Sequence, residues 1–248
     1  MKIISSLSNP TIKRVVSLHE TQNRQTLQNC IVEGIRAIQT FLEAHQEIRE
    51  LYITQKWLEQ AITLCPEEKI NTVSDAVMKK ISTATTPSGI LAIFSIPSTK
   101  KLFIEKNNLP VVLAQIQDPG NMGTLIRTAA AFNKKNIIVV EGVDPWNPKV
   151  IQASAGTIAL VSLFYYSWQQ VVELKKHFHL AALTIEKGKK PEDIDYEKTV
   201  LIIGNEAHGL PREWQQDCNI HITLPMPGGT ESLNAAVAGS IVLYIASK

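Results

Sequence analysis

The chain has 248 residues, of which 44% are hydrophobic and 19% are charged. This composition is typical of a globular protein with a sizeable core and excludes an intrinsically disordered chain. The formal net charge of +2 is too small to indicate a polyanion partner, so any nucleic-acid surface must be a local patch.

The first part of the chain predicts a small α/β domain. Apolar residues recur there at helical spacing in some segments and form short strand-like runs in others. The expected helices are 9–22, 34–46 and 74–82, and the expected strands are 48–54 and 89–96.

A polar, charged stretch follows, with Pro97 and Pro110 at its ends. Such a change of composition between two prolines indicates a linker. We therefore expect a first domain at 1–96, a linker at 97–109 and a second domain at 110–248.

Beyond Pro110, apolar strands alternate regularly with helices. This alternation predicts a mainly parallel sheet covered by helices on both faces. The expected strands are 111–117, 136–142, 161–166, 179–185, 199–206 and 219–225, and the expected helices are 124–132, 147–156, 168–178, 211–218 and 232–246.

Other sequence features argue against several protein classes. The three cysteines are scattered and form no C-x-x-C pair, which argues against a disulfide framework or a zinc site and fits a reducing compartment. The opening segment lacks the pattern of a secretory signal. The apolar closing segment, Leu233–Ser247, is shorter than the roughly 20 residues that span a bilayer. We expect a cytoplasmic protein with no membrane segment and no metal.

Three of the expected strands of the second domain end in unusual loops, DPGNMG, GNEAHGLP and MPGGTES. Ligands of open α/β sheets bind beyond the carboxyl ends of the strands, and glycine lets the backbone approach them closely. The phosphate-binding signatures and the G-x-S-x-G nucleophile elbow are absent. The residues alone thus predict a composite pocket and leave its ligand open.

The segments DPGNMGTLIRTAAAF, IIGNEAHGL and LPMPGGTESLNAAVA resemble the three ordered motifs of the SpoU/TrmH family of RNA ribose 2′-O-methyltransferases, in the SPOUT superfamily. The resemblance covers 111–248. More loosely, SLSNPTIKRVVSLHE, IVEGIRAI and TPSGILAIF resemble the substrate-binding domain of rRNA-directed members. The resemblance implies S-adenosylmethionine as methyl donor, a homodimer, and a deep trefoil knot formed by the C-terminal segment.

By this resemblance, Arg127 activates the 2′-hydroxyl. If Thr124 caps a helix, Arg127 is the third residue of that helix, one turn from the pocket loop. Because a free guanidinium stays protonated, with a pKa above ~12, we expect it to stabilise the developing alkoxide instead of abstracting a proton. The alternative is an arginine paired with a surface carboxylate.

The resemblance also gives catalytic roles to polar residues of the three loops. Asn121 suits orienting Arg127 or the ribose, and Glu206 would steady the loops or orient Arg127. Ser232 and Asn234 open the final helix, where free N–H groups meet an acceptor. The alternatives are a turn residue for Asn121, a surface residue for Glu206 and a plain N-cap for Ser232.

Positions that bind the donor in the family, mainly through main-chain groups, also match this chain. We interpret His208, in the second motif, as exposed and without a role. The expected donor-binding residues are Gly204, Gly209, Leu224, Met226 and Leu233.

Basic residues of the first domain are candidates for RNA phosphate contacts, which position RNA without reading its sequence. These candidates are Lys13, Arg14, Arg24 and Arg36, and solvated charges are the alternative.

The separate first domain favours ribosomal RNA as the substrate. Transfer RNA is one alternative, and a catalytically silent RNA-binding protein of the same fold is another. A redox dinucleotide enzyme is a more distant alternative.

Overall fold

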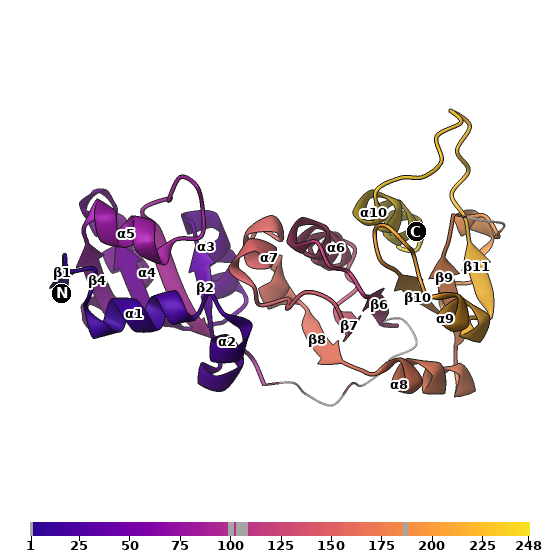
Figure 1. Cartoon of the computed structure of the whole chain (residues 1–248), viewed down its shortest axis with the longest axis horizontal. Coiled ribbons are helices and arrows are strands. Elements are labelled where there is room, and N and C mark those ends of the chain that lie inside the picture. Colours follow the sequence, from indigo (N-terminus) through magenta and orange to yellow (C-terminus); the bar gives the residue numbers. More distant parts are fainter. Residues whose placement is uncertain (1, 99–101, 103–108, 186–187) are drawn as a thin grey trace. The chain divides into compact units, whose positions relative to one another are not determined.

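The computed structural model describes residues 2–98, 102, 109–185 and 188–248. The chain forms two compact units, one of Met1–Ser98 with Asp144–Ala159 and one of Thr99–Val143 with Leu160–Lys248 (Figure 1). Most of the expected linker, 97–109, lies outside the described residues. The domain ranges expected from the sequence are continuous, whereas in the structure Asp144–Ala159 groups with the first unit.

The first unit is built on a five-stranded mixed sheet with the order β1-β4-β3-β5-β2. Strands β1 and β3 run parallel to β4, and β5 runs antiparallel to β3 and β2. Its elements are β1 (Lys2–Ile4), α1 (Pro10–Ser17), α2 (Thr21–Leu27), β2 (Asn29–Glu33), α3 (Ile35–Glu43), β3 (Ile48–Ile53), α4 (Leu58–Leu64), β4 (Ile70–Val73), α5 (Asp75–Ile81), β5 (Ile90–Ser95) and α7 (Pro148–Ala153), with short 3-10 turns at Gln55–Trp57 and Glu67–Lys69.

Several elements of this unit were not predicted. The expected helix 9–22 is two helices, because α1 ends at Ser17 and α2 begins at Thr21. Helix α2 is polar and buries only Arg24, so it has no apolar periodicity to read. Strands β1, β2 and β4 and helix α4 were also not predicted.

The segment 144–159 is held in the first unit by Arg24, which is fully buried. Its guanidinium donates to Asp144 from Nε at 2.8 Å and from Nη2 at 2.6 Å. The guanidinium also donates to the carbonyls of Leu18 and His19 and to the hydroxyl of Thr21. The prediction that Arg24 contacts RNA phosphate is therefore wrong, because the side chain is enclosed and fully engaged.

The second unit is built on a six-stranded sheet with the order β11-β9-β10-β6-β7-β8, in which every strand pair is parallel. Its elements are β6 (Val111–Ala114), α6 (Pro119–Ala131), β7 (Asn136–Val140), β8 (Ser162–Tyr165), α8 (Trp168–Val172), β9 (His179–Leu183), β10 (Thr199–Ile203), α9 (Arg212–Asp217), β11 (Ile220–Ile222) and α10 (Ala235–Ile245), with 3-10 turns at Glu173–Lys176 and Pro191–Asp193. A further 3-10 turn, Thr157–Leu160, lies at the boundary between the two units. The predicted α/β class, with a parallel sheet flanked by helices, is confirmed.

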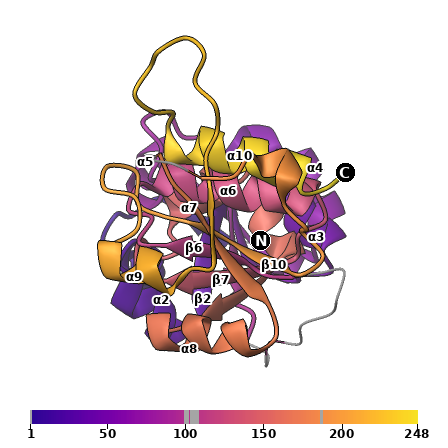
Figure 2. The ribbon, with the colours of Figure 1, turned by 90° about the vertical axis from the view of Figure 1, so that its right-hand side faces the viewer.

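Helices cover both faces of this sheet, with α6 and α10 on one side and α8 on the other (Figure 2). Helix α10 lies close to β10 and α6 at Gly239, where a Cβ would lie 2.7 Å from side-chain atoms of Ile203 and Leu125. On the opposite face, the rings of Trp168 and Trp214 stack at 4.4 Å and join α8 to α9. Among the described residues, no helix has the length and apolar content to cross a membrane.

The strand order reverses between β6 and β10. From β6 the chain adds β7 and β8 on one side, then continues with β9 and β10 on the other, so β6 and β10 become neighbours. Their carboxyl ends form a topological switch point, which is where open α/β sheets bind ligands.

Candidate active site

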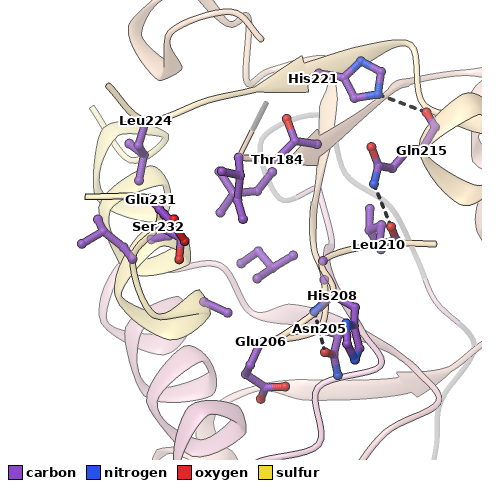
Figure 3. A pocket seen from close by; sticks show the side chains of 18 of the residues that line it. Thr184, Asn205, Glu206, His208, Leu210, Gln215, His221, Leu224, Glu231 and Ser232 are labelled. Carbon is purple, nitrogen blue, oxygen red and sulfur yellow. Dashed lines mark hydrogen bonds between the residues drawn. The ribbon is translucent and has the colours of Figure 1, made fainter. Parts of the chain in front are cut away.

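A cavity of about 620 Å³ lies at the carboxyl ends of β9, β10 and β11 (Figure 3). Leu224, Glu231 and Ser232 face Glu206 and His208 across it. The five expected donor-binding residues all line this cavity, as do Glu206 and Ser232. The lining residues are Leu183, Thr184, Ile185, Ile203, Gly204, Asn205, Glu206, His208, Gly209, Leu210, Arg212, Gln215, Gln216, His221, Leu224, Met226, Glu231, Ser232, Leu233, Ala235 and Ala238.

The loop after β10 requires glycine at two positions. A Cβ on Gly204 would lie 2.8 Å from the backbone of Gly209 and Leu210, closer than real Cβ contacts come. Gly209 has a φ of +63°, in the left-handed region that favours glycine. Asn205 and Gly209 exchange two backbone hydrogen bonds, of 3.1 and 3.0 Å, which close the loop into a tight turn.

The side chain of Asn205 shapes this turn, a role that the sequence reasoning missed. Its Oδ1 accepts from the backbone N–H groups of Ala207 at 2.9 Å and His208 at 3.1 Å. Its Nδ2 donates to the carbonyl of Gln115, just after β6, at 2.9 Å. The sequence did contain a signal for this role, because Asn205 is an amide residue between a buried strand and Gly209.

Glu206 and two asparagines join the three loops. The Glu206 carboxylate accepts from the backbone N–H groups of Gln117 at 3.3 Å and Asp118 at 3.1 Å, and from Asn121 Nδ2 at 3.1 Å. Asn234 Nδ2 donates in turn to Asn121 Oδ1 at 3.0 Å. The expectation that Glu206 steadies the pocket loops agrees with these contacts.

Helix α6 begins earlier than predicted. Asp118 is its N-cap, accepting from Asn121 N at 2.8 Å, and Pro119 is its first residue. Aspartate followed by proline is a strong helix start, and the glycines at 120 and 123 concealed it. The predicted cap at Thr124 is therefore wrong, and Arg127 is not the third residue of the helix but the ninth.

The final helix begins later than predicted. Its N-cap is Asn234, whose Oδ1 accepts from Ala236 N at 2.9 Å and from Val237 N at 3.2 Å. Ser232 lies two residues before the cap and lines the cavity instead.

Arg127 is exposed, and it forms no hydrogen bond or ion pair with the residues that the structure describes. The expectation that Asn121 or Glu206 orients Arg127 within this chain is wrong, because these two side chains bind each other and the loop amides. Arg127, Asn121 and Asn234 are also absent from the described lining of the cavity.

The opposite wall of the cavity is fixed by α9. Gln215 Nε2 donates to the carbonyl of Leu210 at 2.7 Å, and the His221 ring bonds to the carbonyl of Gln215 at 3.1 Å (Figure 3). His208 is exposed, as expected. It also lines the cavity, which was not predicted. In the described part of the chain, no group of three or more His, Cys, Asp or Glu residues could hold a metal ion.

Two protein-family models match this chain. The SpoU rRNA Methylase family matches residues 108–244, and the MRM3-like substrate binding domain matches residues 9–92. The first match contains all three motif loops, and the second lies within the first unit.

Similar proteins extend over nearly the whole chain. An uncharacterized tRNA/rRNA methyltransferase of Synechocystis sp. is 28% identical, over 99% of this chain and 93% of that protein. The 23S rRNA (guanosine(2553)-2′-O)-methyltransferase RlmP of Bacillus subtilis is 26% identical over 98% of both. A crystal structure of an AdoMet-bound rRNA methyltransferase from Sinorhizobium meliloti has a TM-score of 0.87 at 25% identity, covering 99% of this chain and 97% of that one.

Proposed function

Because the chain belongs to the SpoU rRNA Methylase family, we propose that it transfers the methyl group of S-adenosylmethionine to a ribose 2′-hydroxyl of ribosomal RNA. The observation that carries the proposal is the cavity at the carboxyl ends of β9, β10 and β11, which the second and third motif loops line and whose Glu206 is hydrogen-bonded to the first motif loop. The match of the first unit to a substrate-binding domain and the similarity to RlmP support ribosomal RNA over transfer RNA.

The cavity fits the donor. Its volume is within the range of roughly 300–1,000 Å³ typical of small-molecule sites. Leu183, Leu224 and Leu233 provide apolar walls, while Gly204 and Gly209 leave the backbone there without intervening side chains. When bound there, S-adenosylmethionine supplies a methyl group activated by its positively charged sulfur.

On the side of the RNA acceptor, this chain's own residues orient the loops and stabilise the developing charge. The contacts among Asn121, Glu206 and Asn234 fix the three loops before substrate arrives, which lowers the entropic cost of reaching the reactive geometry. Ser232 offers a hydroxyl to the cavity. Arg127, an unpaired cation in the described structure, would stabilise the oxyanion that develops at the 2′-oxygen.

RNA binding is proposed for the first unit. Lys13 and Arg36 are exposed and free to contact phosphates. Arg14 already forms an ion pair with Glu50, since its Nη2 lies 2.7 Å and 2.5 Å from the two carboxylate oxygens. Lys13 and Arg36 are therefore better candidates than Arg14.

A homodimer is proposed through α10. One face of this helix is buried against α6 and the sheet, whereas Val237, Ile241 and Tyr244 are exposed on the opposite face. A helix that is apolar all round requires a partner on its open side. The trefoil knot and a cytoplasmic location remain predictions.

The decisive test is incubation of the protein with labelled donor and, separately, ribosomal or transfer RNA. Label is expected in 2′-O-methyl nucleosides of ribosomal RNA. Label in transfer RNA alone would favour the first alternative, and tight RNA binding without any transfer would favour a silent RNA-binding protein. Arg127→Ala should abolish transfer, whereas the control Lys198→Ala, at an exposed cation of the same unit, should not. Full activity in Arg127→Ala would remove Arg127 from the mechanism.

A further inference from the structure

The position of Glu206 depends on backbone that follows β6. Two of its three contacts are the N–H groups of Gln117 and Asp118. These amides lie between the last residue of β6, Ala114, and the start of α6 at Pro119. Some other part of the structure must hold this short connection in place.

The connection after β6 is paired with the connection after β7. We call 115–117 and 141–143 the paired turns. Gln115 and Glu141 both adopt left-handed conformations, with φ of +57° and +59°, which are uncommon for residues other than glycine. Two such residues facing each other near a candidate active site indicate a geometry that the surroundings impose.

Hydrogen bonds lock the paired turns together. Gln115 N donates to the carbonyl of Val140 at 2.8 Å, and Val143 N donates to the carbonyl of Ile116 at 2.9 Å. Gln115 Nε2 donates to the Glu141 carboxylate at 2.6 Å. This last bond is the side-chain link between the two turns.

The paired turns are also bonded to the loop that carries Glu206. The carbonyl of Gln115 accepts from Asn205 Nδ2. At Gly142, whose φ is +91°, a Cβ would lie 2.5 Å from the carbonyl oxygen of Ile116, so the turns are in direct backbone contact. A shift of the second turn must therefore move Ile116 and the two amides that follow it.

We propose that Gln115 and Glu141 are positioning residues for methyl transfer. Through the bond between them, they hold the Gln117 and Asp118 amides where the Glu206 carboxylate binds. Their effect on transfer rests on the proposed function, whereas their effect on the backbone does not.

The test compares two substitutions at Glu141. Glu141→Gly relieves the left-handed strain but removes the bond to Gln115, whereas Glu141→Gln keeps an acceptor oxygen at the same place. We expect Glu141→Gly to lower kcat roughly tenfold with no loss of thermal stability, since small displacements of catalytic groups reduce rates strongly. Glu141→Gln should retain most of the activity.

A matched control is His45→Gly, because His45 is exposed in the first unit and has a φ of +58°. It should relieve similar strain without affecting kcat. Equal activity in wild type and Glu141→Gly, or equal losses in Glu141→Gly and His45→Gly, would overturn the proposal.

A second readout does not depend on activity. Hydrogen exchange at the Gln117 and Asp118 amides should become faster in Glu141→Gly and stay near the wild-type rate in Glu141→Gln. Unchanged exchange in Glu141→Gly would refute the positioning role even if the enzyme is active. Faster exchange in a protein that transfers no methyl group would instead leave the positioning role intact and refute the proposed function.

Discussion

Replacing Arg24 with methionine should strongly destabilise the first unit. The substitution removes five hydrogen bonds donated by one fully buried guanidinium. It also leaves Asp144, whose side chain is only 12% exposed, without its cation. Breaking a buried ion pair from one side costs about 3–5 kcal/mol, because the remaining charge stays buried and uncompensated.

This loss can be measured by urea or thermal unfolding followed by circular dichroism. For a unit of this size, 3 kcal/mol corresponds to a fall in Tm of roughly 12 °C. The matched control is Arg14→Met, because the Arg14–Glu50 pair is 35% and 30% exposed and should contribute only about 1 kcal/mol or less. Similar losses in the two variants would refute the idea that burial makes Arg24 special.

Replacing both partners distinguishes the stability lost with the ion pair from the cost of leaving one charge buried. In Arg24→Met combined with Asp144→Leu, neither charge remains, so part of the lost stability should return. A double variant that is as unstable as the sum of the two single variants would show that the side chains act independently.

Three further predictions concern other parts of the chain. Gly204→Ala should weaken donor binding roughly tenfold in calorimetry, because the new Cβ meets backbone, while Gly228→Ala, with open space around it, should bind normally. Burial raises the pKa of Cys30 and of Cys218 to about 12, so these thiols lose their protons at lower pH in the unfolded chain than in the folded one. The urea midpoint of unfolding should therefore fall as pH rises from about 9 toward 12. A constant midpoint would contradict this. Val237→Glu combined with Ile241→Glu should convert the proposed dimer into a monomer in light scattering, whereas Leu27→Glu, at an exposed leucine of the first unit, should not.

The sequence predicted the architecture of the second unit well because its strands are buried on both faces. Strands such as Val111–Ala114 and Asn136–Val140 are entirely buried and read as continuous apolar runs. The five expected donor-binding residues all line the cavity, because the second and third motif loops follow β10 and β11.

Contacts between distant residues could not be read in the same way. Arg24 and Asp144 are separated by 120 positions, so nothing local distinguishes Arg24 from an exposed basic residue. The start of α6 was missed for a different reason, because the glycines at 120 and 123 suggested a loop where Asp118 and Pro119 begin a helix. Local composition outweighed a capping signal that was present.

The insertion of 144–159 into the first unit matters for anyone who would recombine this protein with its relatives. A chimera joined within the linker would combine residues 1–98 of a relative with this chain's Asp144, and this chain's Arg24 would be lost. In such a hybrid, the buried carboxylate of Asp144 would face whatever residue the relative has in place of Arg24. Exchange of the first unit between family members thus requires two crossover points in addition to the linker, near Val143 and near Leu160.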